Sequence, residues 1–416
     1  MKFYKFFSTF IILIFSFNYI ALADDIDDEL LDNFSFIIET SAPLNQAPKI
    51  NSRAAIIYDR TSGSILYGKN ENEQRKMAST TKIMTAIIVI ENCNLDDIVT
   101  VSSKSAGTGG SRLGLHTNDK ISVRDLLYGL MLCSGNDAAV ALAEHVSGNI
   151  SGFAELMNKK CNSLKLTSTN FVTPHGLDND NHFTTTYELA LITDYALKNN
   201  IFRKYVSTKN YTVSINGNPK NLSNTNELLG NLEGVYGVKT GFTNGANRCL
   251  VTSIKRDNMD LICIVLGADT KKDRTKDSIQ LIEYAFNNFK MVNIKEKIMS
   301  EFQNWKLCNS SSFLVKKGIS NNVNIILKDL PFDFFPVNCN YIDNISIYIY
   351  CKTSFKAPLQ ENSAIGYLTV SINNENILSL DIYNTNSIPL KNYSNFWNEM
   401  IKNYTSYLES LLYEKI

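Results

Sequence analysis

The chain has 416 residues, of which 44% are hydrophobic and 20% are charged, a composition typical of a globular protein rather than a disordered one. Its 41 basic residues balance its 41 acidic residues, so the formal net charge is zero. Nucleic-acid binding normally requires a basic excess or a basic stripe, and the sequence contains neither. We therefore expect no nucleic-acid partner.

The first 23 residues have the pattern of a cleaved secretory signal. Two lysines precede an apolar stretch at residues 10–17, and a small-residue pattern, Ala-Leu-Ala, ends at Ala23 just before acidic residues. A retained anchor helix is the alternative interpretation, but Asn18 interrupts a stretch that is already short for a bilayer span. The pattern predicts a signal peptide over residues 1–23, export of the protein, and an acidic, mobile segment over residues 24–49.

The next part of the chain predicts a hairpin followed by a block of helices. Residues 53–70 alternate apolar and polar side chains around a Thr-Ser-Gly turn, which indicates a β-hairpin. From Ser79 to Cys93 the apolar residues go nearly all round a helix, so we expect a buried helix with Ser79 at its N-terminus. Further helical patterns cover residues 123–133, 137–146, 153–164 and 185–199.

Short β-type runs return after this helical block. They cover residues 234–241, 247–256 and 261–269, and a helical pattern over residues 276–289 comes after them. Strands therefore flank an inserted helical block on both sides. The economical arrangement is an α/β domain over residues 50–291, in which the hairpin and the three late strands form one antiparallel sheet with helices on both faces and a helical lobe beside it.

The remainder of the chain predicts two further parts. Residues 292–388 contain many short strand-like runs with Asn-rich turns, which indicate a small all-β domain. Residues 389–416 indicate an amphipathic helix. Its apolar positions recur at helical spacing and are Phe396, Trp397, Met400, Ile401, Tyr404, Leu408, Leu411 and Leu412. This helix either docks on its own protein or lies in a membrane interface, which its aromatic richness favours.

The sequence contains no arrangement typical of a metal site. Its eight cysteines and four histidines are scattered, without a C-x-x-C pair, and several cysteines lie inside apolar runs where a buried free thiol is the commoner state. We expect neither a disulfide scaffold nor a metal site, and no cofactor.

Three short polar motifs carry the chemical information. Ser79 is followed three residues later by Lys82, and residues three apart lie on one face of a helix. Taken alone, the pair has an alternative interpretation, in which Ser79 caps the helix and Lys82 extends over its first turn. A Ser-Gly-Asn motif at residues 134–136 falls between two helical runs, and a Lys-Thr-Gly motif at residues 239–241 lies on a predicted strand. Motifs of these types in this order are the signature of penicillin-interacting serine enzymes.

The segments around these motifs resemble the D-alanyl-D-alanine carboxypeptidases of low-molecular-weight penicillin-binding-protein type, serine peptidase family S11. The similar segments follow in the right order over about residues 50–290: STTKIMTA, GGSRLGL, LLYGLMLCSGNDAAVALAEHVSG, TNFVTPHGLDNDNHFTT, GVKTGFTNGANRCLVTS and VLGADTKKDR. The resemblance implies a β-lactamase/transpeptidase-like catalytic domain, and the smaller β domain and the tail also look like the family's C-terminal parts. One departure is Cys133, where an inert residue such as proline is expected.

The residue types explain why the first motif suits such an enzyme. A serine hydroxyl is a weak nucleophile and needs a neighbouring base, and a lysine can serve when burial and nearby positive charge lower its pKa. Lys82 is placed to accept the proton of Ser79. Lys239 on the facing strand would supply the nearby charge and help to hold a substrate carboxylate. The backbone N–H of Ser79 would be one donor to the oxyanion.

Three more residues are expected to act on the scissile peptide. By resemblance, the N–H of Phe242, which follows Gly241 at the end of the Lys-Thr-Gly motif, would be the second oxyanion donor. Ser134 would relay a proton between Lys82 and the departing amine. Asn136 would orient the peptide through its side-chain amide.

Another group of residues is expected to bind the free carboxylate of the substrate. We assign this role to Thr240 and, by resemblance, to Arg274, for which an ordinary surface charge is the alternative interpretation. Recognition of a free carboxylate would make the enzyme a carboxypeptidase. The expected reaction is acylation of Ser79 with loss of the terminal D-alanine from a peptidoglycan stem peptide ending in D-Ala-D-Ala, followed by hydrolysis. β-Lactam antibiotics would acylate the same serine.

Two rival functions fit the sequence less well. A class A β-lactamase shares Ser-x-x-Lys and Lys-Thr-Gly, but it carries a Glu-x-x-Leu-Asn loop and usually Ser-Asp-Asn. This chain has Ser-Gly-Asn and no Glu-x-x-Leu-Asn. A non-catalytic cell-wall-binding scaffold is the second rival, and the intact set of motifs argues against it. We therefore expect an exported enzyme of the cell wall, held at the outer face of the bacterial cytoplasmic membrane by its C-terminal helix.

Overall fold

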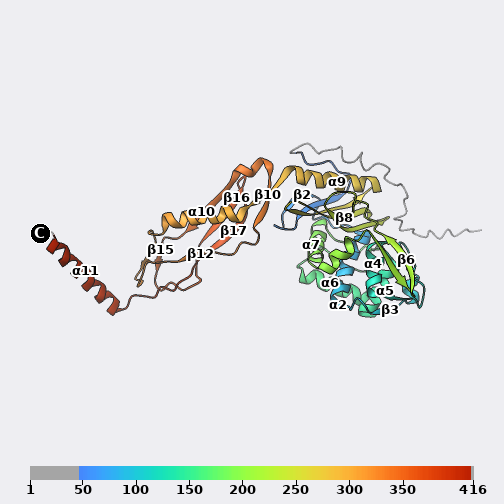
Figure 1. Cartoon of the computed structure of the whole chain (residues 1–416), viewed down its shortest axis with the longest axis horizontal. Coiled ribbons are helices and arrows are strands. Elements are labelled where there is room, and N and C mark those ends of the chain that lie inside the picture. The colour runs from blue at the N-terminus through green and yellow to red at the C-terminus, as the bar shows by residue number, and fades with distance from the viewer. Residues whose placement is uncertain (1–45, 414–416) are drawn as a thin grey trace, which may run out of the picture.

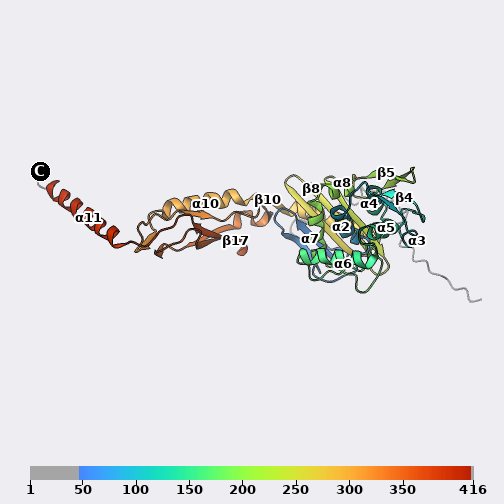
Figure 2. The same ribbon diagram turned by 90° about the horizontal axis from the view of Figure 1, so that it is seen from below.

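The computed structural model describes residues 46–413. The predicted signal peptide and nearly all of the acidic segment lie outside the described residues. Figures 1 and 2 show an elongated molecule with an α/β domain at one end, a smaller domain in the middle and a single helix at the other end. Within residues 46–413, no helix combines the length and the apolar composition needed to cross a bilayer.

The α/β domain is built on one antiparallel sheet. Its strands are β1 (Ala54–Asp59), β2 (Ile65–Lys69), β7 (Val235–Thr243), β8 (Asn247–Arg256) and β9 (Met259–Ala268), in the order β2-β1-β9-β8-β7. Every neighbouring pair is antiparallel. The predicted sheet is confirmed, because the early hairpin and the three late strands lie side by side although the helical block separates them in the sequence.

Different helices cover the two faces of this sheet. Helix α9 (Lys271–Asn288) covers one face, and the helical lobe packs on the other (Figure 1). In β1, Ile56 and Tyr58 belong to the core shared with the lobe, whereas Ala55 and Ile57 belong to the core beneath α9. Because successive side chains of a strand point to opposite faces, a strand buried on both sides has a continuous apolar sequence.

The lobe contains the predicted helices and two small hairpins. Its helices are α2 (Lys82–Asn92), α3 (Ser103–Ala106), α4 (Val123–Met131), α5 (Asn136–Ser147), α6 (Ile150–Ser163), α7 (Thr186–Leu197) and α8 (Asn200–Val206). One hairpin pairs β3 (Ile98–Thr100) with β4 (Lys120–Ser122), and the other pairs β5 (Asn210–Ile215) with β6 (Asn218–Ser223). Apolar periodicity does not predict the β5–β6 hairpin, although its Asn-Gly turn is a strong hairpin signal.

The helix that carries the first motif begins differently from the prediction. A single 3₁₀ turn, η1 (Ala78–Thr81), precedes α2, so Ser79 lies in this turn and not in the α-helix itself. Ala78 has a φ of 46°, which is the left-handed region that residues with a Cβ seldom adopt. As predicted, α2 is buried on nearly all sides, and its first eight residues are all buried.

The smaller domain contains one main sheet and two short strand pairs. The main sheet has four antiparallel strands in the order β12 (Ile325–Leu327), β17 (Glu375–Asn384), β16 (Ala364–Ile372) and β14 (Ile345–Cys351). The short pairs are β10 (Phe289–Asn293) with β13 (Phe334–Asn338) and β11 (Leu314–Lys316) with β15 (Ser354–Lys356). A 3₁₀ segment, η2 (Cys339–Asn344), leads into β14.

The predicted C-terminal β domain is present, and in addition to its strands it contains one helix. Helix α10 (Ile294–Asn309) lies along the sheet (Figure 1). Its residues Ile294, Ile298 and Phe302 recur every four positions and are buried in the core that the strands form. The side chain of Asn293 caps it by accepting a hydrogen bond from the backbone N–H of Glu296. The surrounding Asn-rich sequence, which is typical of turns, obscures this short helical pattern.

The predicted C-terminal helix is present as α11 (Tyr393–Tyr413). In both views it points away from the smaller domain (Figures 1 and 2). Each of its residues from 393 to 410 is exposed, including Phe396, Trp397 and Tyr404, which are 57%, 56% and 63% exposed. The described part of the helix therefore does not dock on its own protein.

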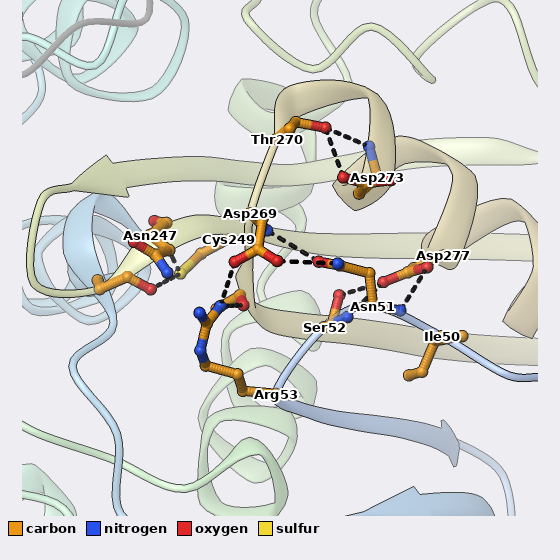
Figure 3. Close-up of polar contacts among 12 residues, drawn as sticks. Ile50, Asn51, Ser52, Arg53, Asn247, Cys249, Asp269, Thr270, Asp273 and Asp277 are labelled. Carbon is orange, nitrogen blue, oxygen red and sulfur yellow. Dashed lines mark hydrogen bonds and ion pairs between the residues drawn. The ribbon is translucent and has the colours of Figure 1, made fainter.

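Hydrogen bonds and an ion pair connect α9 and the loop before it to the residues that precede β1 (Figure 3). The carboxylate of Asp277 accepts hydrogen bonds from the N–H and hydroxyl of Ser52, both at 2.6 Å, and from the N–H of Asn51 at 3.1 Å. Arg53 forms an ion pair of 2.8 Å with Asp269, in the loop that precedes α9. Because Asp277 is buried, its three hydrogen bonds fix the position of the helix whose first turn contains Arg274.

Candidate active site

Ser79 and Lys82 are in direct contact. In a 3₁₀ turn, side chains three residues apart lie one above the other. The Nζ of Lys82 is 2.8 Å from the Oγ of Ser79, and the backbone N–H of Lys82 donates to the carbonyl of Ser79. The local backbone therefore brings the hydroxyl and the amine together.

Lys82 is also held by groups from two segments that are distant in the sequence. Its side chain is completely buried, and its Nζ also donates to Oδ1 of Asn136 at 2.7 Å and to the carbonyl of His175 at 3.0 Å. Burial lowers the pKa of His175 to about 3, with a smaller contribution from the charge of Lys82, so its imidazole is neutral at neutral pH. These contacts hold Nζ of Lys82 at hydrogen-bond distance from the hydroxyl of Ser79.

Ser134 and Asn136 lie where α4 ends and α5 begins. Asn136 is the first residue of α5, and its Nδ2 donates to the carbonyl of Gly109 at 2.8 Å, which fixes the amide that contacts Lys82. Ser134 adopts a left-handed conformation with a φ of 60°. Its Oγ is buried, and among the described residues it has no hydrogen-bond partner. A buried hydroxyl without a partner is unusual in a folded protein.

The Lys-Thr-Gly motif lies on β7, against the turn that contains Ser79. Lys239 is buried, and its Nζ donates to the carbonyl of Thr240 at 3.0 Å. The hydroxyls of Thr240 and Thr225 are 2.7 Å apart. A Cβ on Gly241 would lie 3.0 Å from the backbone nitrogen of Ser79, which is tighter than most Cβ contacts in proteins. Glycine at this position therefore lets the strand approach the nucleophile without displacing the turn.

Phe242 continues β7 beyond Gly241. It pairs with Arg248 of β8 in the sheet register, and the guanidinium of Arg248 lies 3.8 Å from the centre of the Phe242 ring. This stacking is a cation–π contact and immobilises the side chain of Phe242. The backbone N–H assigned to the oxyanion thus belongs to a residue held both by the sheet and by its ring.

Arg274 is not a surface residue, so that alternative interpretation is wrong. It is 1% exposed and forms an ion pair with the carboxylate of Glu227. Oε1 of Glu227 also accepts a hydrogen bond of 2.5 Å from the hydroxyl of Thr275. Burial by itself would raise the pKa of Glu227, but the Arg274 guanidinium and the Thr275 hydroxyl hold it below its ordinary value. The sequence offers no signal for Glu227, because it belongs to no motif and to no periodic run.

Cys133 takes no part in this chemistry. Its thiol donates to the carbonyl of Gly129 at 3.1 Å, and burial raises its pKa to about 11. A protonated, hydrogen-bonded thiol is a poor nucleophile. All eight cysteines are free thiols, and no cluster of three potential metal ligands occurs within residues 46–413.

Comparison with known proteins agrees with this arrangement. A family model for D-alanyl-D-alanine carboxypeptidase matches residues 41–270. The D-alanyl-D-alanine carboxypeptidase DacF of Bacillus subtilis is 31% identical over 330 residues, which cover 78% of this chain and 82% of that protein. DacC of Escherichia coli is 33% identical over 349 residues, covering 80% and 83%. The crystal structure of penicillin binding protein 5 from Haemophilus influenzae gives a TM-score of 0.68 at 28% identity and covers 83% of this chain and 99% of that one.

The sheet, the lobe and the three motifs define a penicillin-binding serine peptidase with a β-lactamase-like fold. The chain belongs to the D-alanyl-D-alanine carboxypeptidase family, because the family model spans more than half of its length. The family, the fold and the enzyme class expected from the sequence are thereby confirmed. Neither a class A β-lactamase nor a non-catalytic scaffold is supported by the comparisons.

The Glu227–Arg274 pair should give stability a specific pH dependence. A carboxyl with a lower pKa in the folded than in the unfolded state stabilises the fold above its ordinary pKa and loses that contribution as the pH falls through the folded value. We expect Glu227→Gln to lower the free energy of unfolding at pH 7 by about 3–5 kcal/mol, because Arg274 stays buried without its partner. Below about pH 4 this difference should shrink. Urea denaturation across the pH range measures it.

The matched control for this experiment is Glu73→Gln. Glu73 pairs with Arg75 at the surface, where its side chain is 50% exposed. Exposed pairs contribute little, so this variant should resemble the wild type at every pH. A Glu227→Gln deficit that stayed constant from pH 7 to pH 3 would contradict the ion-pair explanation.

Proposed function

We propose that this protein removes the terminal D-alanine from peptidoglycan stem peptides ending in D-Ala-D-Ala, through an acyl-enzyme on Ser79. The observation that carries the proposal is the contact of 2.8 Å between Nζ of the buried Lys82 and Oγ of the half-buried Ser79, in a turn that packs against the edge strand bearing the Lys-Thr-Gly motif. A hydroxyl becomes an effective nucleophile when a base at hydrogen-bond distance takes its proton. Membership in the family identifies the substrate class.

Acylation begins with transfer of the Ser79 proton to the neutral amine of Lys82. Oγ then forms a bond to the carbonyl carbon between the two D-alanines, and the backbone N–H groups of Ser79 and Phe242 stabilise the resulting oxyanion. The carbon–nitrogen bond breaks as the leaving amine receives a proton from Lys82 by way of Ser134, whose partnerless hydroxyl is suited to this relay. Asn136 orients the peptide. The terminal D-alanine leaves, and the rest of the peptide stays esterified to Ser79.

Deacylation reverses the roles of the same groups. Lys82 accepts a proton from a water molecule, the oxygen of that water attacks the ester carbonyl, and Ser79 regains its proton. β-Lactam antibiotics acylate Ser79 by the same first step, with opening of the lactam ring in place of amide cleavage. The sequence has no Glu-x-x-Leu-Asn loop to speed hydrolysis, so the penicilloyl ester should persist.

Lys239, Thr240 and Arg274 are proposed to recognise the terminal carboxylate. The Thr240 hydroxyl is buried beside that of Thr225, and Lys239 supplies a buried positive charge on the same strand. The guanidinium of Arg274 is partly neutralised by Glu227, but its Nε is buried and has no hydrogen-bond partner among residues 46–413. That donor is available to a carboxylate that enters the site.

We further propose that the enzyme is exported by its first 23 residues and lies on the outer face of the cytoplasmic membrane, attached by α11. The exposed apolar residues of this helix, including Phe396, Trp397 and Met400, support the proposal. Aromatic and aliphatic side chains on one face of a helix can enter the boundary between headgroups and acyl chains. The smaller domain lies between α11 and the catalytic domain (Figure 2), so attachment by α11 would hold the active site away from the bilayer.

The first test is loss of the nucleophile or its base. Either Ser79→Ala or Lys82→Ala should lower the rate of D-alanine release from a D-Ala-D-Ala peptide by several orders of magnitude, and the double variant should be hardly worse, because members of one catalytic unit act non-additively. Release of D-alanine and mass spectrometry of the penicillin adduct measure the two steps. Near-normal turnover by Ser79→Ala would refute the mechanism.

The second test concerns the carboxylate. A peptide amidated at its C-terminus should have a lower kcat/KM than the free acid, because it loses charge-assisted hydrogen bonds of roughly 1.5–3 kcal/mol. Arg274→Ala alone would leave Glu227 buried without its cation, so the neutral double variant Glu227→Gln/Arg274→Gln is the better probe. In this double variant, the difference in kcat/KM between the free-acid peptide and the amidated peptide should be smaller than in the wild-type enzyme. Equal kcat/KM for acid and amide in the wild-type enzyme would exclude the carboxylate site.

The third test concerns attachment. A chain that ends at Asn392, just before α11, should stay soluble and active when the full mature chain binds lipid vesicles, because binding of this kind scales with buried apolar area. A variant in which Phe396, Trp397 and Tyr404 are all replaced by serine should likewise lose vesicle binding and keep its activity. The control, Asn403→Ala with Ser406→Ala on the polar face, should bind like the wild type. Equal partitioning of the truncated and full chains would rule out attachment by α11.

A further inference from the structure

A buried chain of hydrogen bonds leads from His182 to the peptide group that precedes Ser79. The backbone N–H of Val172 donates to Nδ1 of His182 at 3.0 Å. Nε2 of His182 lies 2.7 Å from Oγ1 of Thr81, and that hydroxyl donates to the carbonyl of Ala78 at 2.8 Å. His182 and Thr81 are 2% and 0% exposed, so water does not compete for these contacts.

The direction of every bond in this chain is determined. A backbone N–H can only donate, so Nδ1 of His182 is the acceptor and the ring proton of the neutral imidazole lies on Nε2. Burial lowers the pKa of His182 to about 4, against a smaller opposing effect of Asp178, so the ring is neutral at neutral pH. Nε2–H therefore donates to Thr81, and the single proton of Thr81 is directed to Ala78.

Gly176 holds the same carbonyl from another side. Its φ is 85°, and a Cβ at this position would lie only 1.9 Å from the oxygen of Ala78. The loop of residues 172–177 is therefore in close backbone contact with Ala78, which no other residue type at position 176 would allow. The carbonyl of Ala78 is fixed in direction by Thr81 and in place by this loop.

The orientation of the Ala78 carbonyl also decides where the N–H of Ser79 points. The two groups belong to one planar trans peptide, in which the C=O and the N–H point in opposite directions. With the carbonyl directed at Thr81 and Gly176, the N–H of Ser79 faces the other way. The backbone nitrogen of Ser79 lies on the side of β7, 3.0 Å from where a Cβ of Gly241 would be.

The same loop also anchors the end of β7. Asp178 accepts hydrogen bonds from the hydroxyl of Thr243 at 2.7 Å and from the N–H of Gly245 at 2.9 Å. Thr243 directly follows Phe242, whose N–H is the second proposed donor. Gly176 and Asp178, two residues apart, thus contact the two backbone segments that carry the two proposed oxyanion donors.

We propose that His182 is a positioning residue for the oxyanion hole, which acts through Thr81 to hold the Ala78–Ser79 peptide with the Ser79 N–H facing the reacting carbonyl. Ala78 needs this restraint because it has a left-handed φ of 46°, a conformation that persists only where the surroundings impose it. The inference rests on the proposed function, since an oxyanion arises only if Ser79 is acylated. Without the restraint, the peptide can rotate and the donor is lost from the transition state.

The experiment measures acylation of the full mature chain by penicillin. Thr81→Val removes the hydroxyl while keeping the shape, and His182→Leu removes the imidazole. Both should lower the limiting acylation rate constant by at least about tenfold, a fraction of the effect of deleting an oxyanion donor, and leave the initial non-covalent affinity for penicillin nearly unchanged. The acylation rate constant should return toward the wild-type value in Thr81→Ser, which keeps a hydroxyl. The same is expected for His182→Gln, because the glutamine amide offers one acceptor and one donor.

The matched control is Thr85→Val. Thr85 is also fully buried, lies one turn further along α2, and donates to the same loop, at the carbonyl of Pro174 at 2.6 Å, without touching Ala78. The thermal midpoint of Thr85→Val should fall about as far as that of Thr81→Val, whereas the acylation rate constant of Thr85→Val should stay close to the wild-type value. If the two valine variants acylate equally slowly, the loop acts only through stability and the proposal is overturned.

A spectroscopic measurement separates geometry from folding. The ester carbonyl of the penicilloyl enzyme lies in the oxyanion hole, and weaker hydrogen bonding raises its infrared stretching frequency. That frequency should rise in Thr81→Val and His182→Leu but not in Thr85→Val; an unchanged frequency in the first two refutes the inference. Absence of any penicilloyl adduct on wild-type Ser79 would instead refute the proposed function, so the two failures are distinguishable.

Discussion

The contact between the buried Lys82 and the half-buried Ser79 is the interaction on which the rest of the site depends. A lysine side chain can be completely buried only if its Nζ finds polar partners in place of water. Here the partners come from the 3₁₀ turn itself, from Asn136 at the start of α5 and from the carbonyl of His175. The turn, the lobe and the loop are each required to complete the surroundings of one amine, so a change in any of them disturbs the others.

Backbone strain is concentrated beside the reacting groups. Ala78 and Ser134 both adopt left-handed conformations, and each of them lies next to or within a motif that contacts Lys82. Such conformations cost of order 1–3 kcal/mol each and persist only when the surroundings impose them. The dense core of the lobe and the close approach of Gly176 and Gly241 provide that restraint.

Charge in the site is balanced by neighbouring groups. Lys239 and Arg274 are both buried, and burying a positive charge without a compensating group is costly. Glu227 compensates Arg274 directly, and a neutral His175 adds no further positive charge beside Lys82. A net positive site remains, which suits a substrate that ends in a carboxylate.

The sequence by itself determined the features that depend on near neighbours. The three motifs, the spacing that places Lys82 over Ser79, the turn residues of the first hairpin and the apolar stripe of α11 can all be read from residues a few positions apart. For the same reason they were sufficient to predict the catalytic fold, the enzyme class and most of the helices and strands. The 3₁₀ start of the catalytic helix was not predicted, because a propensity for helix does not distinguish its first turn from the rest.

Only the tertiary structure decided which distant groups meet. Glu227 with Arg274, and His182 with Thr81, are separated by 47 and 101 positions and carry no pattern that links them. Arg274 could be read as a surface charge until the packing of α9 placed it at 1% exposure. The physical reason is that burial and hydrogen bonding are properties of the assembled core: periodicity indicates which face of an element is apolar, but the partner of a buried polar group is chosen by how whole elements pack.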